Sequence, residues 1–188
     1  SADVLVPLAI EELKLVAGAC LDGRQFELAV NFYFQARQLS PSDAEVNLQL
    51  AAALSEAGER EQAKKVLQKF LSNEITDPTV AAQAWFNLGV VYEKDSADLA
   101  IDAYRKAVEL APKYEPPVAN LAILLTRQGK FAEAIKFLQP HVAAKVDWPR
   151  TAVLMASASR LNNQLGDAIE LLRSVVDSSS NQSDDEIA

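Results

Sequence analysis

The chain has little of what most catalytic or metal-binding sites need. It contains one cysteine, Cys20, and one histidine, His141, among 188 residues. A single cysteine excludes an internal disulfide and a multi-cysteine metal site, and a single histidine excludes a zinc site built from a histidine cluster. Neither a G-x4-G-K-[ST] nor a G-x-G-x2-G phosphate loop is present. We therefore predict a non-enzymatic chain without cofactor or metal, in which Cys20 and His141 are packed residues.

Positive charge is also scarce. Eighteen Lys and Arg residues face 26 Asp and Glu residues, which gives a formal net charge of −8. Nucleic acids and anionic membrane surfaces bind to positively charged faces. We therefore expect neither a nucleic acid nor a membrane surface among the partners of this chain.

Long apolar runs are missing as well. The run Val118–Leu125 is interrupted by Asn120, and no segment approaches the roughly 20 apolar residues that span a bilayer. We therefore expect no direct membrane insertion of this segment. An upstream signal or anchor is compatible with a chain that starts at Ser1, so the sequence leaves the compartment open, and the composition of this soluble segment only favours the cytoplasm.

What the sequence does contain is an internal repeat. Five segments share an alanine, then an aromatic residue or leucine four positions later, and mostly a small or apolar residue three positions after that. The leading alanines are spaced by 34, 37, 34 and 34 residues; they are Ala29, Ala63, Ala100, Ala134 and Ala168. Each is preceded by apolar residues at i, i+3, i+4 and i+7, the spacing of one helical face. This period predicts stacked pairs of helices.

The turn residues agree with this period. A glycine falls between the two helices of three pairs, where we expect a left-handed backbone conformation; these glycines are Gly23, Gly58 and Gly129. Pro41 and Pro112 are expected to close second helices, because proline cannot continue a helix. Asp43 and Asp77 are placed to cap the helices that follow them.

The third repeat carries an almost complete family motif. Its residues are Trp85, Leu88, Gly89, Tyr92, Ala100, Tyr104, Ala107 and Pro112. This pattern resembles the tetratricopeptide repeat (TPR), W-x2-L-G-x2-Y followed by A-x3-F, A and P. The turn between its two helices is one residue shorter than in the family. The resemblance implies an all-α, right-handed superhelical solenoid of about five helix-turn-helix repeats.

The resemblance also sets the expected boundaries. The array covers residues 10–182, preceded by a lead-in and followed by a disordered acidic tail at 183–188. The expected repeats are 10–43, 44–80, 81–114, 115–148 and 149–182. In the lead-in, residues 1–9, the apolar segment Val4–Leu8 is expected to precede the first helix. Three extra residues near 72–80 predict either a longer loop or an extended helix.

In the TPR family the first helix of each repeat lines a concave groove that binds a peptide or a helix of a partner protein. The positions that face this groove by resemblance form the candidate partner-binding set: Leu48, Gln49, Ala52, Phe86, Asn87, Val90, Asn120, Ile123, Arg127, Val153 and Arg160. The apolar members would hold hydrophobic side chains of the partner. The predicted function is therefore that of an interaction scaffold or adaptor.

Three of these candidates are amides in one repeat position. Gln49, Asn87 and Asn120 recur in successive repeats, and an amide side chain can donate and accept hydrogen bonds at once. A row of them could hold a peptide backbone without reading its sequence, or could simply decorate a solvated helix face. Phe86 beside them is expected to be exposed without a structural role, which favours the binding interpretation.

Another TPR subgroup binds chaperone carboxyl termini through a clamp of Lys, Asn and Arg residues. Only Lys14 matches that clamp here, while Gly18, Gln49 and Gln83 stand where Asn or Lys is expected. A carboxylate needs fixed cationic donors to offset its desolvation. We therefore do not expect binding of chaperone tails through the first three repeats.

The two ends of the array support an alternative function. Ile169, Leu172 and Val176 near the end of the array have no evident covering helix, and the segment Val4–Leu8 at the other end is apolar. Exposed apolar area usually marks an interface. The alternative is a structural building block that forms a homo-oligomer through its terminal repeats.

Charge is distributed unevenly along the predicted groove. Acidic residues lie on or beside the first helices of repeats 1 and 2; they are Glu11, Asp22, Glu45 and Glu56. Basic residues lie on or beside those of repeats 3 to 5; they are Lys94, Arg127, Arg150 and Arg160. A partner with the opposite distribution would be complementary, although ordinary surface charge would give the same pattern.

The basic end of this distribution gives a testable prediction. We expect the double substitution Arg127→Glu/Arg160→Glu to weaken a partner that carries acidic residues toward repeats 4 and 5, because two attractive pairs become repulsive. The measurement is the dissociation constant of a captured partner for the wild type and the variant. An unchanged constant would remove the electrostatic interpretation.

Overall fold

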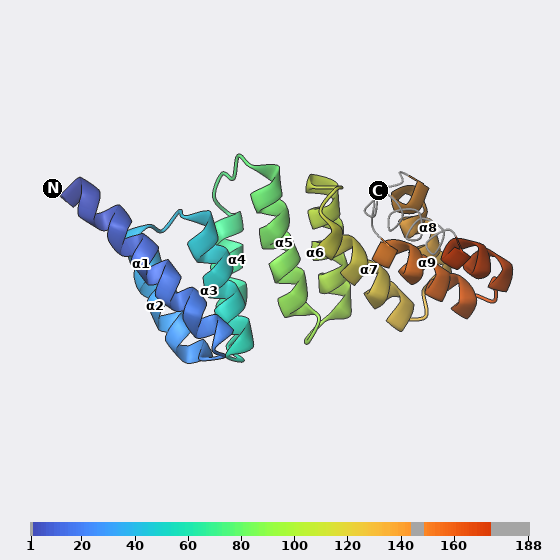
Figure 1. Cartoon of the computed structure of the whole chain (residues 1–188), viewed down its shortest axis with the longest axis horizontal. Coiled ribbons are helices and arrows are strands. Elements are labelled where there is room, and N and C mark those ends of the chain that lie inside the picture. Colours follow the sequence, from blue (N-terminus) through green and yellow to red (C-terminus); the bar gives the residue numbers. More distant parts are fainter. Residues whose placement is uncertain (1, 144–148, 174–188) are drawn as a thin grey trace, which may run out of the picture. The chain divides into compact units, whose positions relative to one another are not determined.

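The computed structural model describes residues 2–143 and 149–173, and within these ranges the secondary structure is helical, with no strand (Figure 1). The helices are α1 Ala2–Asp22, α2 Phe26–Leu39, α3 Ala44–Glu56, α4 Arg60–Leu71, α5 Pro78–Tyr92, α6 Ala97–Leu110, α7 Glu115–Arg127, α8 Phe131–Ala143 and α9 Pro149–Leu161. Residues 165–173 form a further helical segment. The prediction of an all-α repeat fold is confirmed.

The helices form two compact units. The first unit, Ser1–Ala111, contains the pairs α1/α2, α3/α4 and α5/α6, and the second, Pro112–Ala188, contains α7, α8, α9 and the segment 165–173. Contacts run mainly between helices that are neighbours in sequence, with an added contact between α3 and α5 in the first unit and between α7 and α9 in the second. These added contacts bring successive first helices side by side, as a helical repeat requires.

The repeated alanine has the same place in every pair. It is the fourth residue of the second helix, and all five of these alanines are buried. The apolar stripes predicted from the sequence form the core of each unit. The largest fully buried side chains include Leu50, Leu67, Leu88 and Tyr104 in the first unit and Leu121 and Leu138 in the second.

The two helices of the third pair approach very closely. A Cβ atom added to Gly89 on α5 would lie 2.5 Å from Cε1 of Tyr104 on α6, far inside van der Waals contact. The corresponding residues in the other pairs are also small and buried; they are Ala17, Ala51, Ala122 and Ala156. A small residue at this position therefore determines how near the second helix can lie.

The expected helix ends are confirmed. The Asp43 carboxylate accepts a hydrogen bond from the Val46 backbone N–H at 3.0 Å, and the Asp77 carboxylate accepts one from Thr79 at 2.7 Å. These are the side-chain caps of α3 and α5. Pro41 and Pro112 each follow the last residue of a second helix by two positions.

Four of the five turns within the pairs contain one left-handed residue. It stands two positions before the second helix in each case, at Arg24, Gly58, Gly129 and Asn163, with φ of 56°, 83°, 74° and 66°. The prediction is correct for Gly58 and Gly129 and wrong for Gly23, which lies one residue too early. The third pair has a different turn, because α5 ends at Tyr92 and Ser96 caps α6.

The helix bounds decide two predictions about segment boundaries. The extra residues between the second and third pairs form a longer loop, since α4 ends at Leu71 and α5 begins at Pro78. The segment Val4–Leu8 does not precede the first helix but belongs to α1. Pro7 lies near the start of this helix, where a proline removes only one backbone hydrogen bond. The tail at 183–188 lies outside the described residues.

The close approach at Gly89 gives a test of the packing. We expect Gly89→Ala to lower the free energy of unfolding by about 1 to 3 kcal/mol, because the added methyl group displaces the buried Tyr104 ring. Thermal or urea unfolding followed by circular dichroism measures this change.

The matched control is Gly18→Ala in α1, where a Cβ atom would lie 3.8 Å from the Tyr33 hydroxyl oxygen, an ordinary contact. This variant is expected to gain about 0.5 to 1 kcal/mol from better helix propensity. Equal effects of the two substitutions would contradict the packing account.

Candidate functional site

The first unit has an open hollow between two successive first helices. It has a volume of about 90 Å³ and is lined by Ala51, Ala52, Ser55 and Glu56 of α3 and by Asn87, Val90 and Val91 of α5. Three predicted partner-binding residues, Ala52, Asn87 and Val90, therefore come together. Ser55 was not predicted to line a site, and Glu56 was expected only as part of the acidic end of the groove, although both lie three or four positions after Ala52 and so share its helix face.

Helical spacing explains which residues flank this hollow. On α3, Glu45, Gln49, Ala52 and Glu56 follow one another at i, i+4, i+7 and i+11, which places them along one face. Ala52 and Glu56 line the hollow, so the exposed amide of Gln49 lies on the same face one turn away.

Two predicted apolar residues are partly used by the fold. Leu48 is half-buried and packs against the core of the first unit. Phe86 is half-buried, and its ring centre lies 5.8 Å from that of Tyr104. The expectation that Phe86 has no structural contact is therefore wrong, because the second helix of its own pair supports it. The Tyr104 hydroxyl in turn donates a 2.6 Å hydrogen bond to the Glu93 carboxylate, a contact that the repeat pattern did not indicate.

The remaining candidates lie in the second unit. Asn120, Ile123 and Arg127 follow one another on α7 at i, i+3 and i+7; the first two are half-buried and Arg127 is exposed. Val153 and Arg160 are exposed on α9, which contacts α7. Amide, apolar and basic side chains thus stand on the first helices of the second unit.

Lys14, the one residue that matches the carboxylate clamp, is already paired. Its ammonium donates hydrogen bonds to Glu45 of α3 and to Glu11, the latter at 3.0 Å. The hydrogen bond to Glu45 raises the pKa of Lys14 above its ordinary value. Because two carboxylates already neutralise this cation, the structure offers little to a partner's carboxylate here.

The single cysteine and histidine are packed side chains. Cys20 is a buried free thiol in the core of the first unit. His141 is half-buried on α8, with its ring centre 5.4 Å from that of Phe137. Burial lowers the pKa of His141 and so favours the neutral imidazole.

The described part of the chain offers neither a cluster of metal-binding side chains nor a helix that could span a membrane. In residues 2–143 and 149–173 no group of three or more His, Cys, Asp or Glu side chains is placed to hold a metal ion. None of the helices within these ranges is both long and apolar enough to cross a membrane.

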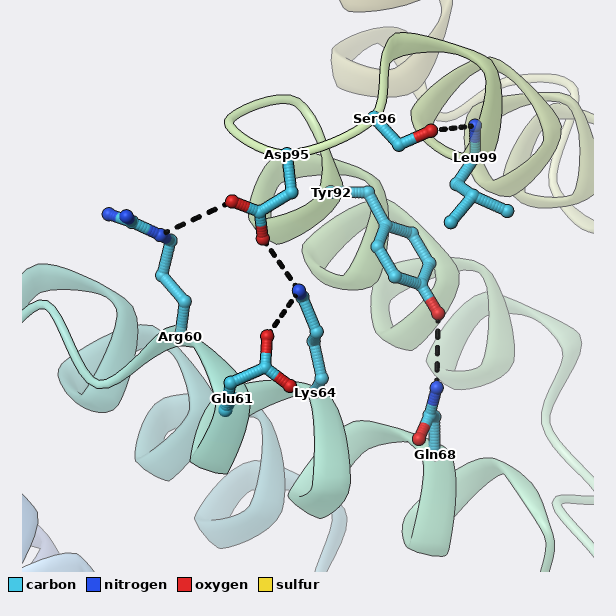
Figure 2. A network of polar contacts seen from close by, with 8 residues as sticks. All are labelled: Arg60, Glu61, Lys64, Gln68, Tyr92, Asp95, Ser96 and Leu99. Atoms are coloured by element: carbon cyan, nitrogen blue, oxygen red, sulfur yellow. Dashed lines mark hydrogen bonds and ion pairs between the residues drawn. The ribbon is translucent and has the colours of Figure 1, made fainter.

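A polar network holds α4 against the third pair (Figure 2). Lys64 of α4 donates to Asp95, in the turn after α5, and to Glu61, each at 2.6 Å. The Gln68 amide donates to the Tyr92 hydroxyl at 3.0 Å. The Lys64 ammonium lowers the pKa of Asp95 by its hydrogen bond, and Asp95 raises that of Lys64. The network fixes the second pair to the third and so helps to position α3 beside α5.

A larger hollow, of about 420 Å³, lies on α5 and α6. Its lining includes Trp85, Lys106 and Glu109, and the Lys106 ammonium covers the Trp85 ring at 4.2 Å from the ring centre. No residue predicted to bind a partner lines this hollow.

The repeated helix pairs define a helical-repeat protein. Models of the tetratricopeptide repeat match residues 48–115 and 92–158, which together span more than half of the chain. The chain belongs to the tetratricopeptide repeat family, as its sequence predicted, and this fold is an interaction scaffold.

Relatives share the repeat over part of their length. Protein O-mannosyl-transferase TMTC1 of Homo sapiens is 32% identical over 98 residues, which is 52% of this chain and 11% of that protein. Tetratricopeptide repeat protein 8 of Caenorhabditis elegans is 31% identical over 127 residues, 66% of this chain and 24% of that protein. This chain thus spans less than a third of either relative.

Solved structures match the fold over nearly the whole chain. A crystal structure of the MamA protein has a TM-score of 0.71 at 20% identity, covering 96% of this chain and 97% of that chain. At this level of identity the likeness establishes the fold alone.

The network in Figure 2 gives a pH-dependent prediction. The pKa of Asp95 is held below its ordinary value of 3.8, so its stabilising effect is present above that value and is lost as the pH falls through the folded pKa. We expect Asp95→Asn to lower the melting temperature at pH 7. The difference from the wild type should shrink as the pH approaches 3.

Thermal melts of both proteins from pH 7 to pH 3 measure this difference. Asp102→Asn, which removes an exposed carboxylate from α6, is the control and should show little pH dependence. A difference between wild type and Asp95→Asn that is the same at both ends of the pH range would contradict the ion-pair account.

Proposed function

We propose that this chain is a protein-interaction scaffold whose first unit binds an extended peptide segment of a partner across α3 and α5. The observation that carries the proposal is the hollow in which Ala52, Asn87 and Val90 meet. Repeat proteins present such surfaces because each pair contacts mainly its neighbours and leaves one face of each first helix uncovered.

The side chains at the hollow suit peptide binding. Ala51, Ala52, Val90 and Val91 form an apolar surface that can cover a hydrophobic side chain of the partner. Asn87 stands at its edge, and its amide can accept from one backbone group and donate to another. The hollow is open to solvent, which suits binding more than chemistry that requires water to be excluded.

Self-association is the second candidate, and the exposed side chains of α1 favour it. Leu5, Leu8 and Leu15 are 64%, 55% and 76% exposed. Residues three and seven positions apart lie close to one helix face, so these leucines form an apolar stripe. Ile169 and Leu172 are also exposed, near the other end of the described residues; Val176 lies outside them. An uncovered apolar stripe of this kind is typical of an interface.

Selection of peptides from a displayed random library on the purified chain tests the first proposal. We expect bound peptides whose affinity falls about tenfold or more with Val90→Glu, because a carboxylate in the hollow must be desolvated against an apolar side chain. Fluorescence anisotropy with a labelled selected peptide measures the affinity.

The matched control is Leu28→Glu, which places the same charge on an exposed apolar site in the first turn of α2, where a negative charge is tolerated. It should leave the affinity unchanged. No selected peptide, or peptides that bind the two variants equally, would overturn the groove proposal. Sedimentation of the chain over a range of concentrations would then test self-association.

A further inference from the structure

The size of the hollow indicates which side chain it can cover. Its volume is about 90 Å³, whereas a cavity of about 150 Å³ accommodates a benzene ring. The apolar part of its lining comes from Ala51, Ala52, Val90 and Val91. A small aliphatic side chain fills this space, whereas a phenyl or indole ring would extend out of it into solvent.

The polar edge of the hollow is negative. Glu56 is the last residue of α3, so its carboxylate adds to the partial negative charge of the helix C-terminus. Glu45, on the same face, is neutralised by Lys14. Within the described ranges, no cation pairs with Glu56. The hollow therefore offers an apolar surface beside one carboxylate that is available to a partner.

The neighbouring helix ends reinforce this sign. Asp22, the last residue of α1, is exposed. Glu11 and Glu45 both pair with Lys14, so two carboxylates face a single positive charge. The cations at this end are Arg24, in the turn after α1, Lys94, in the turn after α5, and Arg60, the first residue of α4, which pairs with Asp95. Acidic residues thus outnumber basic ones on and beside the first helices of this unit, and their field favours a cationic segment.

We propose that the first unit recognises a basic peptide segment in which a small aliphatic residue stands one or two positions from a lysine or arginine. The aliphatic side chain enters the hollow, the cation pairs with Glu56, and Asn87 binds the peptide backbone. Residues two apart in an extended chain are about 6.5 to 7 Å apart, so one extended segment can reach both features. This inference rests on the proposed peptide-binding function and adds the chemistry of the partner.

The test uses the peptides selected on the wild-type chain. We expect them to contain Ala, Val or Ile near Lys or Arg. Replacing that cation by Gln should weaken binding about two- to fivefold, the range for an exposed ion pair, and the loss should diminish in high salt. Glu56→Gln should weaken the original peptide by the same factor and should not weaken the Gln peptide further.

A charge exchange makes the test more specific. A lysine at the last residue of α3 is tolerated, because a cation is favourable at a helix C-terminus. The Glu56→Lys variant should therefore bind a peptide in which Glu replaces the basic residue better than it binds the original peptide. Glu109→Lys changes the same charge in the last turn of α6, and it should leave both affinities as in the wild type.

The outcomes separate this inference from the proposed function. Peptides that depend on Val90 but lack a basic residue, or that bind Glu56→Lys as well as the wild type, would overturn the inference and leave groove binding intact. Peptides insensitive to Val90→Glu would overturn both. Sensitivity to Glu109→Lys instead of Glu56→Lys would move the site to the hollow on α5 and α6 and so overturn the inference.

Discussion

The close contact between the two helices of each pair is the constraint on which the rest of the structure depends. Gly89 lies directly under the Tyr104 ring, and alanines occupy the corresponding place in the other pairs. Because of this contact, one face of every first helix is buried against the second helix of its own pair. The adjoining face is covered by the next pair, as at α3 and α5. On a first helix that lies between two other pairs, such as α3, one narrow face remains uncovered, and the candidate site lies there.

The same constraint explains how much of the fold could be predicted. Burial of the repeated alanine and of the apolar stripe follows from spacing alone, and so do the caps at Asp43 and Asp77, because these depend on nearby residues. The sequence pattern placed the left-handed residue of the first turn at Gly23, one residue too early. The turn geometry requires a left-handed conformation at a fixed position, whatever residue stands there. Arg24 occupies that position although Gly23 is adjacent.

The candidate site was less predictable for a related reason. The family resemblance named Ala52, Asn87 and Val90 as groove positions, and these three residues line one hollow, because the helical repeat determines which side chains share a face. The sequence pattern could not show that the Phe86 ring packs against Tyr104 or that Glu45 neutralises Lys14. Those contacts depend on side-chain conformations across two helices, which a one-dimensional pattern does not contain.

The six-residue connection at 72–77 has a consequence for how the chain can be altered. It joins α4 to α5 outside any helix pair, and most of its side chains are exposed. Exposed connections of this kind are where proteases cut and where inserted sequence is best accommodated. An added domain at this point would leave every helix pair whole, so the array has a natural attachment point for engineering beside its third repeat.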